Sequence, residues 1–353
     1  MKILLLGGTG AIGSHFSDIL YNTNDTVVIT SRSYRESQGN IEYRQGNAKN
    51  IVFLDNLIEE KWDVIVDFMN YSDEEFRERI DRFLSKTKQY IFLSSARVYN
   101  KSEVAITEES KRLLDVCKDK EYLLTSEYAL SKARQENILK ASSKRNWTII
   151  RPYITYSNIR LQLGNLEKES WLYRALKGRT IVFSKDINNH YTTLTYGVDV
   201  ANGIASLMNK TDSYGEAFHI TCNSAYLWSD ILDTYLDVLE DELGHRPKVI
   251  FQDLTDYLSW NALEYQVTFD RLFDRKFDNT KINKHINTND FTEVKEGLRK
   301  CVHEFVKNPK FNAINWKQEA KKDRFTNEKA SILEISEFKQ ILKYILFRYF
   351  TKD

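Results

Sequence analysis

The sequence predicts an α/β fold in which helices cover both faces of a parallel sheet, and three observations support this. Short runs rich in Val, Ile and Leu alternate with amphipathic stretches over the first half of the 353 residues. The apolar runs are nearly continuous, as in strands that are buried on both faces. A glycine-rich turn, GGTGAIG at 7–13, directly follows the first run. We therefore expect a doubly wound parallel sheet, followed by a smaller C-terminal α/β domain and a helical C-terminal extension.

The expected elements follow one another along the chain. In the first half we expect strands and helices alternating, with strands at 2–7, 26–30, 41–46, 63–68, 90–95 and 147–152 and helices at 12–21, 73–85 and 126–142. Residues 191–208 have the pattern of a strand, a turn at Gly197 and a helix begun by Asp199, and 217–221 predicts a further buried strand. Residues 227–243 predict an amphipathic helix. The spacing of apolar residues over 332–350 is typical of a final helix.

The domain boundaries are expected where this pattern loosens. Residues 1–155, with 191–222 returning to them, would form the sheet domain. Residues 156–190 and 223–285 would form a substrate-binding domain, and 286–353 a helical extension. We expect the final helix to dock on its own domain or on a second subunit in a homodimer; a place on a membrane surface is the alternative.

The composition excludes several classes of function. Lys and Arg number 51 against 50 Asp and Glu, a net charge of +1 that provides no basic field for nucleic acid. The three cysteines are far apart and the histidines lack metal-ligand spacing, so no metal site is expected. The first apolar run is too short for a signal peptide, and no run reaches the ~18 apolar residues of a membrane span. We expect a cytoplasmic protein with no nucleic-acid partner and no integral span.

The glycine-rich turn predicts a dinucleotide site. Gly7 would allow a sharp turn, Gly10 a close approach of backbone to a pyrophosphate, and Gly13 close packing of helix on strand. The N-terminus of the helix would then face the negative charge. Such turns also occur without a ligand, but the position of this one, ahead of the alternating pattern, favours the dinucleotide.

The end of the second strand predicts which dinucleotide binds. An NAD site has an acid there that accepts from the ribose 2′-hydroxyl. This chain has Ser31 and Arg32, whose hydroxyl and guanidinium suit a 2′-phosphate, unless Arg32 is only a solvated loop residue. We therefore expect NADP(H), with NAD(H) as the open alternative.

A tyrosine and a lysine point to proton transfer. Tyr128 and Lys132 are four residues apart on an expected helix and so share a face. A nearby ammonium favours the phenolate of tyrosine, whose unperturbed pKa is about 10. Such a pair can exchange a proton with a carbonyl or an alcohol during hydride transfer. Ser95 ends the strand 90–95, at the sheet edge where ligands bind, and is placed to hydrogen-bond a substrate carbonyl. The spacing also arises by chance in a chain with 20 tyrosines.

In the order GGTGAIG, SSARVY, YALSK and RPY, these motifs resemble the short-chain dehydrogenase/reductase superfamily with its Rossmann-type sheet. The resemblance covers about residues 1–285 and is specific to the extended, nucleotide-sugar epimerase/dehydratase branch. It implies a catalytic triad of Ser95, Tyr128 and Lys132. It also implies cofactor contacts from Gly7, Thr9, Gly10, Ala11, Ile12, Gly13, Ser31, Arg32, Asn47, Ala48, Phe68, Met69, Lys132, Pro152 and Tyr153.

Three departures from the family pattern bear on the reaction. Asn47 stands where the family has an acid near the adenine, and the connection between 70 and 90 is short, as in atypical members, some of which have lost the Tyr–Lys pair and bind RNA. Ala96 and Arg97 stand where a 4,6-dehydratase has an acid pair, so that dehydration is not expected.

The function expected from these features is NADPH-dependent reduction of a nucleotide-linked 4-keto sugar, for example a dTDP-4-keto-6-deoxyhexose for a surface polysaccharide. A nucleotide-sugar 4-epimerase is the first alternative, and a non-catalytic protein that binds cofactor or RNA is the second. The residues expected to hold the substrate are Arg97, Arg160, Arg174 and Arg179.

Overall fold

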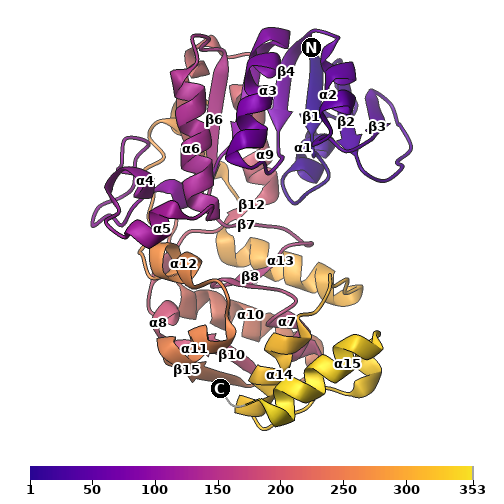
Figure 1. The fold of residues 1–353 in the computed structure, drawn as a ribbon, viewed down its shortest axis with the longest axis vertical. Helices are drawn as coiled ribbons and strands as arrows, with labels where there is room; N and C mark the ends of the chain where they lie inside the picture. Colours follow the sequence, from indigo (N-terminus) through magenta and orange to yellow (C-terminus); the bar gives the residue numbers. More distant parts are fainter. Residues whose placement is uncertain (352–353) are drawn as a thin grey trace. The chain divides into compact units, whose positions relative to one another are not determined.

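Seven parallel strands form the central sheet of the computed structural model, which describes residues 1–351 (Figure 1). The sheet order is β13-β6-β5-β4-β1-β2-β3, and every pair of neighbours is parallel. Its strands are β1 (Lys2–Leu6), β2 (Thr26–Ser31), β3 (Ile41–Gln45), β4 (Trp62–Asp67), β5 (Thr87–Leu93), β6 (Trp147–Pro152) and β13 (Glu216–Ile220). The predicted fold class is confirmed: a doubly wound sheet whose strand order reverses between β1 and β4.

Helices cover both faces of this sheet, as the nearly continuous apolar strands require. One face is covered by α1 (Gly13–Leu20) and α9 (Gly197–Leu207), and the other by α2 (Ile51–Ile58), α3 (Asp73–Lys86) and α6 (Tyr128–Ala141) (Figure 1). Side chains of β1 alternate between the two cores: Ile3 and Leu5 pack under α1 and α9, while Leu4 and Leu6 face the opposite layer.

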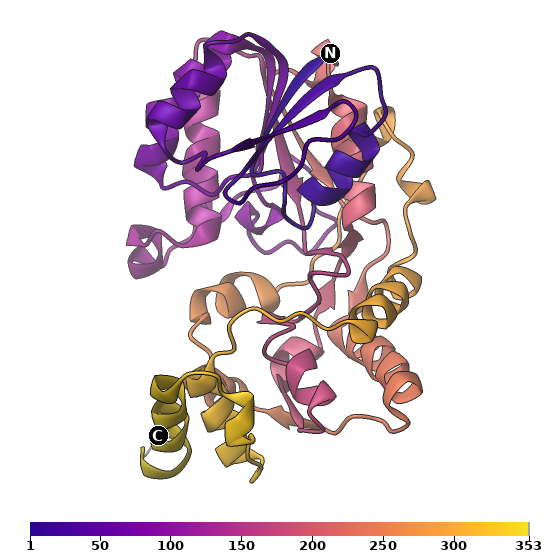
Figure 2. The same ribbon diagram turned by 90° about the vertical axis from the view of Figure 1, so that its right-hand side faces the viewer.

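The chain divides into two compact units, which Figure 2 also shows in a second view. Unit 1 consists of Met1–Thr155, Thr193–Ser224 and Arg275–Val294, and unit 2 of Tyr156–Thr192, Ala225–Asp274 and the described chain from Lys295 onward. Shorter elements of unit 1 are η1 (Ala96–Val98), α4 (Leu113–Val116), α5 (Lys120–Leu124), β12 (Thr195–Tyr196), η2 (Thr211–Ser213), η4 (Ile282–Lys284) and η5 (Thr288–Asp290), and β7 (Thr155–Tyr156) has one residue in each unit.

The segment 275–294 lies in unit 1, which corrects the expectation that residues up to 285 belong to the substrate domain. Phe277 forms a backbone bridge with Ile106, and the Asn279 side-chain amide donates to the Thr221 carbonyl at 2.8 Å. Ile282 is fully buried in the core beneath α1 and α9. These contacts join residues far apart in sequence, so the local pattern gave no sign of them.

Unit 2 is built from short strand pairs and helices. Its elements are β8 (Gln162–Leu163), β9 (Leu166–Glu167), α7 (Leu172–Leu176), β10 (Ile181–Ser184), α8 (Lys185–Asn188), β11 (Tyr191–Thr192), β14 (Tyr226–Leu227), α10 (Trp228–Leu243), β15 (Val249–Gln252), α11 (Leu254–Trp260), α12 (Glu264–Gln266), η3 (Val267–Arg271), α13 (Val294–Lys307), α14 (Trp316–Phe325), η6 (Ile332–Glu334), α15 (Phe338–Ile345) and η7 (Leu346–Phe350). Strands β10 and β15 pair in parallel, and β11 pairs with β14 in antiparallel. No helix within residues 1–351 is long and apolar enough to cross a membrane.

The expected final helix over 332–350 is interrupted. Ser331 and Glu334 form a capping box around the short turn η6, and the chain is extended at Glu337, where φ is −114° and ψ is 130°. Ile335 between them is buried with Trp316 and Tyr344. The helix is interrupted where the side chain of Ile335 is buried against unit 2.

A buried ion network fixes α14 to the segment that runs from α7 to β10. The Arg174 guanidinium lies 2.6 Å from an Asp323 oxygen and 3.0 Å from a Glu319 oxygen, and all three residues are buried. Arg179 lies 3.0 Å from the second Asp323 oxygen. Although burial disfavours the charged carboxylate, the two guanidinium groups hold the pKa of Asp323 below its usual value.

We predict that Arg174→Met destabilises unit 2 by about 3–5 kcal/mol, because it removes one of the cations that neutralise the buried carboxylates of Glu319 and Asp323. The matched control is Arg160→Met, which removes an exposed guanidinium 3.3 Å from Glu167 and should cost less than about 1 kcal/mol. Urea unfolding followed by tryptophan fluorescence measures both, since four of the six tryptophans lie in unit 2. Equal, small effects of the two substitutions would contradict the structural role of the network.

Candidate dinucleotide and catalytic site

The turn after β1 has the shape that a dinucleotide needs. Gly7 has φ +71°, and a Cβ on it would meet the Met69 sulfur at 2.7 Å. A Cβ on Gly13 would lie 2.7 Å from the backbone of Gly8, so helix and turn touch directly. A Cβ on Gly10 would meet nothing within 4 Å, which leaves open space above the turn. The three glycines therefore meet the three steric requirements that the sequence suggested.

The N-terminus of α1 is available to an anion. Ile12 stands at the N-cap position, and within the described chain no side chain caps this helix or places an acid in its first turn. Its first amide groups thus keep a partial positive charge directed toward the open side of the turn. The turn itself is held by the Gly7 amide, which donates to the Thr30 hydroxyl at 3.0 Å. Thr9, Ala11 and Ile12 are partly exposed on the same turn. These residues fit a bound pyrophosphate.

The ends of β2 and β3 form the neighbouring part of the site. Ser31 is buried and its carbonyl accepts from the Gly46 amide at 2.8 Å, so the turn backbone is fixed. Arg32 is exposed at the carboxyl end of β2. After β3, Asn47 is exposed while Ala48 is buried in the core. An exposed guanidinium at this place suits a phosphate on the adenine ribose.

A buried carboxylate at the end of β4 was missed by the sequence analysis. Asp67 is fully buried and accepts from the Met69 amide at 2.9 Å and the Tyr90 hydroxyl at 2.8 Å. Burial raises the pKa of Asp67 to about 6, and the hydrogen bonds oppose that rise. Phe68 and Met69 follow it, partly exposed. The signal was present, since this aspartate directly follows the apolar run 64–66 of β4.

Lys132 places an ammonium group at the same edge of the sheet. The side chain is 3% exposed, and its Nζ donates to the Leu93 carbonyl at 2.8 Å. The Met69 carbonyl lies at 3.5 Å. Burial lowers the pKa of Lys132 to about 8, against the charges of Asp67 and Glu136, which raise it. The ammonium therefore bridges the carboxyl ends of β5 and β4, beyond which ligands of such sheets bind.

Tyr128 is the first residue of α6 and remains 38% exposed. The Lys132 Nζ lies 5.8 Å from the centre of its ring, and the Arg97 guanidinium lies 5.4 Å from the same centre. Arg97 also donates to Glu127, the N-cap of α6. The Arg97 amide donates to the Ser95 hydroxyl at 3.2 Å. The structure thus brings the loop of Ser95 and the Tyr–Lys pair together, with Arg97 between them.

A second buried network holds α6 against β5 and β6. Glu136 accepts from Arg151 at 2.7 and 2.8 Å, from Ser94 at 2.6 Å and from Arg112 at 3.1 Å. Burial opposes ionisation of Glu136, but the charge and hydrogen bonds of Arg151 and the other partners lower its pKa to about 2. Arg151 also donates to the Tyr99 hydroxyl at 2.9 Å. Sequence reasoning passed over this network, although an arginine inside the apolar strand 147–152 is its signal.

Pro152 and Tyr153 lie at the carboxyl end of β6. Pro152 is paired with Ile220 of β13, and Tyr153 is buried, its ring centre 5.4 Å from that of Phe277. This places both residues at the sheet edge that carries Lys132 and the glycine turn.

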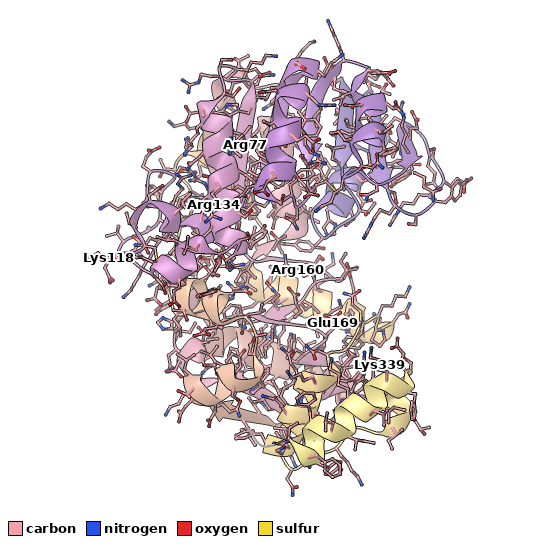
Figure 3. The ribbon with its side chains drawn as sticks, in the orientation of Figure 1. Arg77, Lys118, Arg134, Arg160, Glu169 and Lys339 are labelled. Carbon is pink, nitrogen blue, oxygen red and sulfur yellow. The ribbon has the colours of Figure 1, made fainter. Side chains whose placement is uncertain are left out.

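The expected substrate arginines are not grouped together. Arg97 lies beside Tyr128 in unit 1, as described, and Arg160 is an accessible residue of unit 2 (Figure 3). Arg174 and Arg179 are buried in the ion network of unit 2. The prediction that these two bind substrate is corrected: their charges are already matched by buried carboxylates, so they are not accessible to a diphosphate. Within residues 1–351, no three His, Cys, Asp or Glu side chains are grouped as metal ligands.

Comparison with known families and proteins identifies relatives of this chain. A model described as the NAD dependent epimerase/dehydratase family matches residues 3–221. The chloroplast stem-loop binding protein of 41 kDa b of Arabidopsis thaliana is 26% identical over 236 residues, covering 62% of this chain and 58% of that protein. The dTDP-D-glucose 4,6-dehydratase of Dictyostelium discoideum is 23% identical over 175 residues, 40% of each chain. The chain therefore spans about half the length of these curated relatives.

Solved structures share the fold. WbmH of Bordetella bronchiseptica, in complex with NAD+, superposes with a TM-score of 0.67 and 15% identity over 87% of this chain and 98% of that one. UDP-glucuronic acid 4-epimerase of Bacillus cereus, with UDP-glucuronic acid and NAD, has a TM-score of 0.65 and 16% identity over 87% and 99% of the chains. The dTDP-glucose 4,6-dehydratase of Bacillus anthracis, with NAD, has a TM-score of 0.65 and 18% identity over 87% and 97%.

We predict that Gly13→Ala lowers the stability of the protein, whereas Gly10→Ala lowers its affinity for the cofactor. Gly13→Ala forces a Cβ into the Gly8 backbone and should destabilise unit 1 by about 1–3 kcal/mol. Gly10→Ala has room in the folded chain, so its free energy of unfolding should change by less than about 1 kcal/mol. Its affinity for NADPH should nevertheless fall at least about 10-fold, because the added methyl occupies the space above the turn. Urea unfolding measures the change in stability, and NADPH fluorescence titration measures the change in affinity. An affinity of Gly10→Ala equal to that of the wild type would show that the turn does not contact the cofactor.

Proposed function

Since this chain belongs to the NAD dependent epimerase/dehydratase family, we propose that it is an NADPH-dependent reductase of a nucleotide-linked 4-keto sugar. The observation that carries the proposal is the pairing of an accessible tyrosine with a buried lysine at the carboxyl edge of the sheet. Tyr128 is 38% exposed and the Lys132 ammonium lies 5.8 Å from its ring centre. A dTDP-4-keto-6-deoxyhexose is the example substrate.

In the proposed reaction the chain positions the substrate and moves one proton. The Tyr128 hydroxyl donates its proton to the keto oxygen as that oxygen gains negative charge. The positive charge of Lys132 stabilises the resulting phenolate, and Ser95 orients the keto group through its hydroxyl. Because Tyr128 is partly exposed, water can return the proton after the reaction. When bound, the reduced nicotinamide supplies the hydride.

The charge at the end of β2 supports NADPH over NADH. The exposed guanidinium of Arg32 stands where NAD-binding sites have a carboxylate. A net reductase draws on the reduced NADP pool, whereas an epimerase returns the hydride to the same sugar. Residues 96–97, which follow Ser95, contain no acid pair and therefore do not support elimination of water.

A 4-epimerase that retains NAD is the second candidate. The Bacillus cereus protein with the same fold is a UDP-glucuronic acid 4-epimerase solved with NAD. The same Tyr–Lys pair would serve it, since epimerisation passes through a keto sugar and requires the same proton transfer in both directions. Interconversion of two sugars without net consumption of NADPH would identify this reaction.

A non-catalytic RNA-binding protein is the candidate from another class. It is favoured by the name of the Arabidopsis relative, a stem-loop binding protein. The balance of 51 basic against 50 acidic residues and the retained Tyr–Lys pair support the enzyme instead. The substitution of Tyr128 distinguishes the two.

We predict that Tyr128→Phe lowers kcat by about 10²- to 10⁴-fold, the range that general acid catalysis provides, while NADPH still binds. Loss of nicotinamide absorbance with the 4-keto sugar measures kcat, and fluorescence titration measures binding. Tyr21→Phe, at a tyrosine of unit 1 that is 43% exposed, is the matched control and should retain full activity. Equal kcat values for the two variants would contradict the role of Tyr128. If both variants also bound RNA as the wild type does, the non-catalytic RNA-binding function would be favoured.

We predict that Arg32→Ala weakens NADPH about 10- to 100-fold and leaves NADH nearly unchanged, because one charge-assisted contact to the 2′-phosphate is lost. Arg77→Ala, at an exposed arginine of α3 in the same unit, is the control and should bind both as wild type does (Figure 3). Parallel titrations with the two cofactors give the ratio of their dissociation constants. A ratio in Arg32→Ala equal to that of the wild type would show that Arg32 does not set the preference for NADPH.

A further inference from the structure

The last helical segment of unit 2 carries an apolar stripe on its exposed side. Phe338, Leu342, Leu346 and Phe350 recur at every fourth residue of α15 and η7, and each is between 49% and 74% exposed. Residues at this spacing lie on one side of a helix. The stripe therefore forms a continuous apolar surface.

The opposite side of the same helix is the one that docks on unit 2. Tyr344 is 3% exposed, and its hydroxyl donates to Asp323 at 2.6 Å and accepts from the Ala330 amide at 2.8 Å. Ile341 and Phe347 pack against the cluster around Trp316. The exposed stripe is thus not the face by which the helix is held to its own unit.

Further exposed apolar side chains belong to the same C-terminal segment as the stripe. Within the described chain, eight large apolar residues between 325 and 350 are exposed, a concentration that other parts of the chain do not reach. They are Phe325, Ile332, Leu333, Phe338, Leu342, Leu346, Tyr349 and Phe350. Exposed apolar groups gathered in this way mark an interaction surface.

The charges beside the stripe are positive. Lys339, which Figure 3 labels, and Lys343 are exposed one position after Phe338 and Leu342 and therefore follow the stripe along the helix. Residues 335–351 contain these two lysines and Arg348 but one acid, Glu337. Nearby acids such as Asp323 and Glu334 are occupied by the buried network. The surface therefore fits an occupant that is apolar and negatively charged.

We propose that this helix binds the surface of an anionic lipid bilayer, with Phe338, Leu342, Leu346 and Phe350 in the acyl boundary and Lys339 and Lys343 at the headgroups. A helix with an apolar stripe of Phe and Leu beside lysines has the form of interfacial helices, and the long lysine side chains can reach the headgroup layer. A second copy of the chain fits less well, since a two-fold contact would bring like-charged lysines together. The inference is independent of the proposed reaction.

Sedimentation of the full chain with vesicles tests the proposal. Phosphatidylcholine vesicles are compared with vesicles in which about one third of the lipid is phosphatidylglycerol. We expect the protein to pellet with the anionic vesicles and to remain in the supernatant with the neutral ones. Failure to pellet with either would overturn the proposal and leave a protein partner as the occupant.

Three variants identify the surface. Leu342→Ser with Leu346→Ser, and separately Lys339→Glu with Lys343→Glu, should each weaken vesicle binding by at least about 10-fold. Leu263→Ser removes a leucine of unit 2 that is 47% exposed and should bind as wild type does. Circular dichroism shows that each variant is folded. Binding unchanged in both double variants, or a wild-type dimer that the leucine variant converts to monomer without any vesicle binding, would contradict the proposal.

Discussion

A buried positive charge joins the parts of the candidate site. The Lys132 ammonium donates to the Leu93 carbonyl and lies 3.5 Å from that of Met69, so it connects α6 with the ends of β5 and β4. The charge of the buried Asp67 carboxylate favours the protonated, positive form of Lys132. Burial lowers the pKa of the lysine to about 8 and raises that of the aspartate to about 6. The glycine turn lies at the same sheet edge because parallel strands end together.

One face of α6 carries both the proposed catalytic residues and a residue that holds the helix in place. Tyr128, Lys132 and Glu136 are spaced by four residues and therefore lie on one face of the helix. Tyr128 remains accessible, Lys132 is buried at the sheet edge, and Glu136 is fixed by Arg151. The ion pair positions the helix, so the orientation of the tyrosine depends on a carboxylate two turns away.

Local sequence patterns predicted the sheet and the glycine turn because their causes are local: apolar runs, helix periodicity and the size of glycine. Asp67 and Arg151 stand out as charged residues beside apolar runs, but the contacts of Asp67 with Tyr90 and of Glu136 with Arg151 join different elements, and local patterns do not predict such contacts. The same reason explains the error at Arg174 and Arg179, whose carboxylate partners follow about 150 residues later. The break at Ile335 within the expected final helix also depends on a tertiary contact, the burial of that side chain with Trp316.

The proposed reaction requires that Tyr128 and Lys132 act together on the sugar and the cofactor. A crystal structure of the protein with bound NADPH tests this most directly. We expect the Lys132 Nζ to contact the nicotinamide ribose and the Tyr128 hydroxyl to face the reactive edge of the nicotinamide ring. A cofactor bound with Tyr128 directed away from it into solvent would contradict the claim.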